Sequence, residues 1–132
     1  MENPVFYVQY AHARLASIQR NWVTMFGTEA PEQVSPSPED LAQLAAEAKS
    51  LLRELMVFPN TVALAAMHRE PHRMFHFATT LASVVHRWWG AARWLDEAQP
   101  GISAMNLQVA KAAQVVLAEA LRLCAISAPE RM

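Results

Sequence analysis

The sequence predicts an all-α protein, a single helical bundle of about five helices in one domain that spans residues 1–132. Hydrophobic residues make up 53% of the chain and charged residues 17%, which is typical of a compact domain with a substantial core. The chain has only three glycines, and its long runs rich in Ala, Leu and Val are separated by Pro, Ser and Asn. This punctuation indicates helices joined by short loops.

The first predicted helix covers about residues 4–22. Asn3 is a typical N-cap, and Pro4 stands at the first helical position, where its missing N–H is harmless. Apolar and aromatic side chains recur every three or four positions along this segment, which predicts one buried stripe. Residues 23–37 are rich in Gly, Pro and Ser, so they form the longest predicted loop.

Two helices are predicted in the next stretch. Ser37 is the expected N-cap of a helix that runs to about Met56, with Pro38 in its first position and acidic residues in its first turn. Pro59 is expected to end that segment, and Asn60 then caps a short helix to about Arg69.

The last two predicted helices are the longest. Pro71 begins one that reaches Trp94 or Leu95, and the Pro-Gly pair at 100–101 breaks the chain after it. Ser103 is the expected N-cap of the final helix, which ends near residues 124–125.

Composition limits the possible functions. A single cysteine, Cys124, cannot form an internal disulfide and points to a reducing, cytoplasmic setting. No run approaches the roughly 20 apolar residues of a membrane span, and no signal-peptide pattern opens the chain, so we expect no membrane partner. The formal charge of −1 argues against broad attraction to nucleic acid, although nine of the eleven basic residues are Arg, which suits local phosphate and base contacts.

Tyr7, Tyr10 and Arg14 are three and then four residues apart, so they share one face of the first helix. Two aromatic planes and a guanidinium in a row could stack on unpaired bases and bond to their edges. On spacing alone, an ordinary structural role is the alternative: the tyrosines would be core residues, and Arg14 would form a surface ion pair.

A second aromatic group comes late in the fourth predicted helix. Trp88, Trp89 and Trp94 stand there beside two arginines, Arg87 and Arg93. Such a group can form a platform for bases or belong to the core. Neighbouring helical residues point about 100° apart, so at most one of Trp88 and Trp89 can face a given ligand.

Three separated segments carry a family resemblance. Residues 3–14 resemble the helix that opens the anticodon-binding domain of arginyl-tRNA synthetases, class I enzymes whose domain is often called the DALR domain. Residues 69–73 resemble the family's turn into its long helix, and residues 128–132 resemble its C-terminus, which ends on the same terminal Met132.

The resemblance implies a function for this face. It implies that the chain binds the anticodon loop of tRNA(Arg) through Tyr7, Tyr10, Arg14, Trp94 and Met132, on one exposed concave surface. The tail would pack back so that Met132 approaches the loop, whereas a disordered tail is the alternative.

The resemblance also implies partners. Catalysis and ATP would belong to a catalytic domain of the same synthetase, because the ATP-handling motifs of class I synthetases are absent here. The domain alone is expected to perform no catalysis and to need no cofactor. An excised domain is the simplest account of such a chain, and a naturally free-standing one is the alternative.

The sequence departs from the family in two places. A Phe-Tyr-Asn-Glu-Cys run is commoner in bacterial members where this chain has Trp-Trp-Gly-Ala-Ala at 88–92. Ala125 replaces the usual Gly after the last helix, and Ala takes the left-handed cap only at a cost.

Other chemistry has weak support. His68, His72 and His76 are spaced by four, but Pro71 interrupts the helix and no thiol or carboxylate completes a metal site, so capping and packing roles are expected. No catalytic motif with recognisable spacing is present. The competing hypothesis is a helical protein-interaction domain that has kept the fold and lost tRNA binding.

Overall fold

The computed structural model describes residues 3–28 and 37–132, and these form a bundle of helices. Its helices are α1 (Pro4–Phe26), α2 (Pro38–Gln43), α3 (Ala46–His68), α4 (His72–Ala91) and α5 (Pro100–Leu123). No strand occurs among the described residues. The predicted all-α class is therefore confirmed. The part of the predicted loop at residues 29–36 lies outside the described residues.

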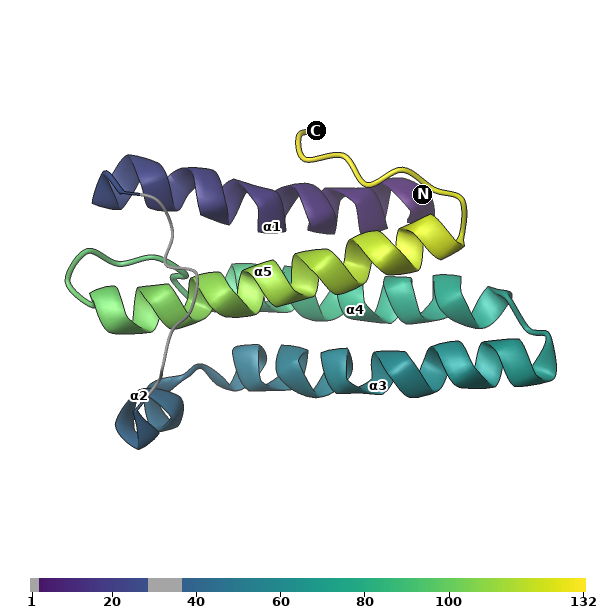
Figure 1. The fold of residues 1–132 in the computed structure, drawn as a ribbon. Helices are drawn as coiled ribbons and strands as arrows, with labels where there is room; N and C mark the ends of the chain where they lie inside the picture. The colour runs from purple at the N-terminus through teal and green to yellow at the C-terminus, as the bar shows by residue number, and fades with distance from the viewer. Residues whose placement is uncertain (1–2, 29–36) are drawn as a thin grey trace.

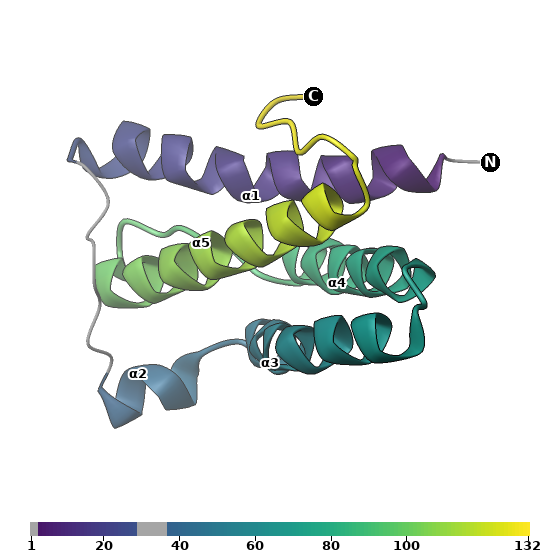
Figure 2. The ribbon, with the colours of Figure 1, turned by 45° about the vertical axis from the view of Figure 1, so that its right-hand side comes forward.

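Helices α4 and α5 lie in the middle of the bundle, between α1 on one side and α3 on the other (Figures 1 and 2). Within the described chain α1 packs on α4 and α5, and makes no direct contact with α3. Among the described residues the largest fully buried side chain is Trp88 of α4, and every long helix also contributes fully buried leucines to the core. The outer side of α1 is therefore free of other helices.

The first helix begins as expected and ends later. Asn3 accepts a hydrogen bond from the Val5 amide through Oδ1 at 2.9 Å, and Pro4 follows as the first helical residue. The helix continues four residues beyond Trp22, because Trp22 and Phe26 pack together with ring centroids 4.2 Å apart. Gly27 then ends it with φ of 67°, a left-handed conformation that glycine adopts without steric cost.

The predicted division between the next two helices is wrong, although the outer boundaries at Ser37 and near Arg69 are confirmed. Ser37 and Asp40 do form a capping box at the start of α2, but α2 stops at Gln43. Leu44 then takes an extended conformation and is buried in the core. The α3 helix passes through Pro59, where a break was expected. Phe58 packs on Phe77 of α4 with centroids 5.2 Å apart, so tertiary packing on this flank offsets the backbone hydrogen bond that proline cannot donate.

The end of α4 and the start of α5 also differ from prediction. Helix α4 ends at Ala91, and Trp94 folds back so that its indole Nε1 donates to the Trp88 carbonyl at 3.2 Å. Ser103 is not the cap of α5, which begins at Pro100. Instead Ser103 is buried, and its hydroxyl bonds both the amide and the carbonyl of Asp96. Residues 92–99 are thereby fixed as an ordered connector.

The C-terminal tail is ordered on the bundle surface. Ala125 has φ of 57°, the left-handed conformation expected at this position, and the amides of Ala125 and Ile126 bond back to Arg122 and Leu121. This turn directs the tail back over α1 in both views (Figures 1 and 2). The expectation that the tail packs back is confirmed.

Candidate nucleic-acid interface

Arg14 of α1 lies where this helix meets α4. Its guanidinium carbon lies 4.4 Å from the ring centre of Tyr10 and 5.1 Å from that of Trp89, so the cation is held between two aromatic rings. Its Nη1 lies 2.8 Å from Nδ1 of His86, and Nη2 donates to the Tyr10 hydroxyl at 3.4 Å. Nε is buried without a hydrogen-bond partner. These contacts join Arg14 to His86, Tyr10 and Trp89, and they do not form the surface ion pair that was the alternative.

His86 fixes the position of Arg14. A guanidinium only donates hydrogen bonds, so Nδ1 of His86 must be the acceptor and Nε2 carries the hydrogen. That Nε2 donates to the Tyr7 backbone carbonyl at 3.1 Å, and the imidazole packs on the Tyr7 ring at 4.6 Å. His86 was not among the site residues predicted from the sequence. Its position three residues before Trp89 on α4 places both side chains on one helix face, and this spacing could have revealed it.

The two tyrosines differ in exposure. Tyr10 is 44% exposed, and its ring is available to a ligand. Tyr7 is half-buried and packs against the hydrophobic core as well as against His86. Tyr7 thus supports the site from below, and Tyr10 forms part of its surface.

Trp89 and Trp94 differ in their exposure. Trp94 is only 5% exposed, and its ring stacks on Trp88 at 3.5 Å, so the expectation that Trp94 lies open on the same face as Tyr10 is wrong. The reason is the early end of α4, which lets Trp94 fold back onto the core. Trp89 is half-buried and reaches the surface beside Arg14. Of the adjacent pair at 88 and 89, only Trp89 faces the site, as helical geometry requires.

Three side chains of α1 hold the tail. Gln9 donates to the Ser127 carbonyl at 3.0 Å, and the buried His12 donates from Nδ1 to the Pro129 carbonyl at 2.8 Å. Arg20 donates to the Glu130 carbonyl at 3.2 Å. These bonds fix the tail backbone up to residue 130 and bring the last two residues beside Arg14.

These elements together enclose a shallow hollow of about 370 Å³, which we call the Arg14 hollow. Its lining comes from α1, α4 and the tail: Tyr10, Ala13, Arg14, Ser17, Arg20, Trp89, Glu130, Arg131 and Met132. The side chains that line it include three arginines and one glutamate, so their summed charge is positive although the whole chain carries a formal charge of −1. Exposed aromatic rings beside arginines are the combination that binds unpaired nucleotides.

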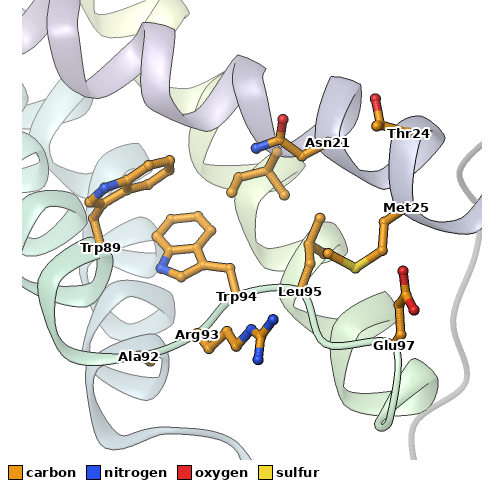
Figure 3. Close-up of a pocket in the computed structure, with 10 residues that line it drawn as sticks. Asn21, Thr24, Met25, Trp89, Ala92, Arg93, Trp94, Leu95 and Glu97 are labelled. Atoms are coloured by element: carbon orange, nitrogen blue, oxygen red, sulfur yellow. The ribbon is translucent and has the colours of Figure 1, made fainter.

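A second hollow of about 500 Å³ adjoins the first, and we call it the Trp94 hollow (Figure 3). It lies between the last turns of α1 and the connector at residues 92–97, and Trp89 lines both hollows. The edge of Trp94 forms part of its floor, with Met25 and Leu95 beside it. The five residues expected to converge are therefore divided: Tyr10, Arg14 and Met132 line the Arg14 hollow, Trp94 lines its neighbour, and Tyr7 supports the Arg14 hollow from below.

The family model described as the DALR anticodon binding domain matches residues 8–132. The chain belongs to the DALR anticodon-binding domain family. Its curated relatives include an arginine–tRNA ligase of Anoxybacillus flavithermus, 40% identical, and one of Desulforudis audaxviator, 41% identical, with 99% of this chain covered in each case. The arginyl-tRNA synthetase of Thermus thermophilus has a similar fold, with a TM-score of 0.74 and 32% identity over 96% of this chain.

This DALR domain spans 23% of the length of each of those curated relatives and 21% of the Thermus chain. In the part of the chain that the structure describes, no three side chains of His, Cys, Asp or Glu are placed to hold a metal ion. Within the same residues, no helix is long and apolar enough to cross a membrane.

Proposed function

We propose that this DALR domain binds the anticodon loop of tRNA(Arg) as the C-terminal domain of an arginine–tRNA ligase. The observation that carries the proposal is the Arg14 hollow, where the Tyr10 and Trp89 rings lie against a guanidinium and Met132 lines the same hollow. The family match and the ligase relatives support it. Attachment of arginine, with its ATP, would take place in a catalytic domain of the same protein, and such a role in translation would belong to the cytoplasm.

Each wall of the hollow has a task in this proposal. Tyr10 and Trp89 offer rings on which an unpaired base can stack, and the arginines neutralise the neighbouring phosphates. Arg14 is already held by His86, Tyr10 and Trp89, so little side-chain entropy is lost when it meets a base. Met132 closes the hollow with a flexible apolar side chain that adapts to the base surface.

A titration with two RNA hairpins tests the proposal. One is the anticodon stem-loop of tRNA(Arg), and the other has the same stem with an altered anticodon. We expect the domain to bind the first hairpin more tightly at low salt, and to bind RNA less tightly as the salt concentration rises. On single strands the logarithm of the binding constant falls by about 0.7 per phosphate contact for each tenfold rise in salt concentration. Isolated binding should be weak, since the rest of a synthetase would supply further contacts.

Two variants give the titration its control. Tyr10→Ala removes one ring of the hollow and should weaken binding by about tenfold, given the usual contribution of one base stacked on an aromatic side chain. Met56→Ala changes an 80% exposed side chain on α3, on the far side of the bundle, and should bind as the unaltered protein does. Equal affinity of the unaltered protein for both hairpins would contradict the proposed function and favour the protein-interaction alternative.

A further inference from the structure

Two histidines support the Arg14 hollow, and they use their ring nitrogens in opposite ways. Nδ1 of His12 bonds the Pro129 carbonyl at 2.8 Å, and a carbonyl only accepts, so this Nδ1 carries a hydrogen. A proton gained at the other ring nitrogen leaves that bond intact. His86 instead accepts from the Arg14 guanidinium through Nδ1 at 2.8 Å and donates from Nε2 to the Tyr7 carbonyl at 3.1 Å. Its bond to Arg14 therefore requires a neutral imidazole.

A proton on Nδ1 of His86 would turn this contact into a repulsive one. An imidazolium donates from both nitrogens, so two donors and two positive charges would face each other across 2.8 Å. The Tyr7 carbonyl would still hold Nε2, so the ring would stay in place and the guanidinium would move. Arg14 would then lose the bond that orients its Nη1.

We propose that His86 is a positioning residue for RNA binding, whose neutral form orients the Arg14 guanidinium toward a base and whose protonation releases it. This inference rests on the proposed function and adds a pH dependence to it. Imidazole is the side chain whose ordinary titration lies between about pH 5 and pH 8. Recognition of the anticodon should therefore weaken as the pH falls through this range.

The groups around the imidazole fit this role. Arg14 is the cation that contacts it directly, and α1 also packs the Tyr7 and Tyr10 rings beside it, at centroid distances of 4.6 and 5.9 Å. Further charged groups on the elements around α4 are Arg20, Glu130 and Arg131 in the Arg14 hollow, Glu47 and Arg87 in a separate hollow on the α3 side, and the pair of Glu119 and Arg122 on α5.

The ratio of affinities for two RNA hairpins measures base recognition at each pH. One hairpin is the anticodon stem-loop of tRNA(Arg), and the other has an altered anticodon. A lower pH also adds positive charge at histidines outside the hollow, which attracts both hairpins alike and cancels in the ratio. In the unaltered protein the ratio should fall by about five- to tenfold between about pH 8 and about pH 5.5, as expected for the loss of one oriented hydrogen bond.

Three variants assign this change to His86. His86→Gln supplies an amide that does not titrate, whose oxygen can accept from Arg14 and whose nitrogen can donate to the Tyr7 carbonyl, so the ratio should stay high at both pH values. His86→Phe keeps a ring against Tyr7 without the nitrogens, so the ratio should be low at both. His76→Gln removes an exposed histidine of α4 outside the Arg14 hollow and should behave as the unaltered protein does.

Circular dichroism at each pH checks that the variants are folded. If His86→Phe does not fold, the glutamine variant and the pH profile still decide the question. A ratio that is high and equal at both pH values in the unaltered protein would overturn the inference and leave the proposed function standing. An equal fall in His86→Gln would also overturn it, because the loss would then come from the RNA or from another group. No preference between the hairpins at about pH 8 in the unaltered protein would contradict the proposed function itself.

Discussion

Replacing Arg14 by lysine should weaken RNA binding far more than it weakens the fold. Lysine keeps the positive charge but has a single nitrogen, so it cannot bond His86, lie against Tyr10 and donate outward at the same time. If Arg14 reads a base edge with its planar fork, the loss should be about 1–3 kcal/mol, roughly 5- to 150-fold in affinity.

The cost to stability follows from the same contacts. The hydrogen bond to His86 contributes about 1 kcal/mol net, and the stacking of the cation on Tyr10 contributes about 0.5–1 kcal/mol where the ring is exposed. Lysine preserves part of both interactions, so unfolding free energy should fall by about 1 kcal/mol at most. For a chain of this size that lowers Tm by about 2–4 °C.

Stem-loop titration and thermal unfolding of the same variant measure both quantities. Arg122→Lys is the matched control, because Arg122 is exposed on α5 and pairs with Glu119 away from both hollows. That control should leave both measurements unchanged. An Arg14→Lys protein with a strongly lowered Tm that still distinguishes anticodons when folded would refute a contact between Arg14 and RNA.

Three further outcomes follow from the described contacts. Ala125→Gly should raise the unfolding free energy by about 0.5–1 kcal/mol, because residue 125 has positive φ. Ala112→Gly, at an exposed position inside α5, should lower it by about 1 kcal/mol, and a loss in both variants would contradict backbone strain at residue 125. Trp94→Ala should lower the free energy of unfolding, measured by urea denaturation, by about 3–5 kcal/mol, and a loss below 1 kcal/mol would contradict the stacking on Trp88. Burial raises the pKa of the Cys124 thiol, so its alkylation should reach half its maximal rate at a higher pH than that of a free cysteine peptide; an equal or lower pH would contradict the burial.

Local sequence signals predicted the helical class and several of the helix ends. Asn3, Ser37 and Ala125 act through their own backbone neighbourhood, so their roles were readable from the chain alone. Pro59 shows the limit of such reasoning. Proline locally favours the end of a helix, but the packing of Phe58 against α4 outweighs this preference and α3 continues. That packing is visible only in the folded chain.

The candidate site was predictable where it lies on one helix. The spacing of Tyr10 and Arg14 alone places them on a common face, and the structure brings them together. Trp89 and His86 come from another helix, and their contact with Arg14 depends on how α4 packs against α1. Trp94 was misplaced because α4 ends earlier than its apolar run suggests.

The most direct test of the central claim follows the methionine methyl groups by NMR while the tRNA(Arg) anticodon stem-loop is added. Met132 lines the Arg14 hollow, whereas Met56 and Met67 are 80% and 72% exposed on α3, on the opposite side of the bundle. We expect the Met132 methyl signal to move as RNA bases stack beside it, while the Met56 and Met67 signals stay in place. Movement of the two α3 methyl signals with an unchanged Met132 signal would contradict it.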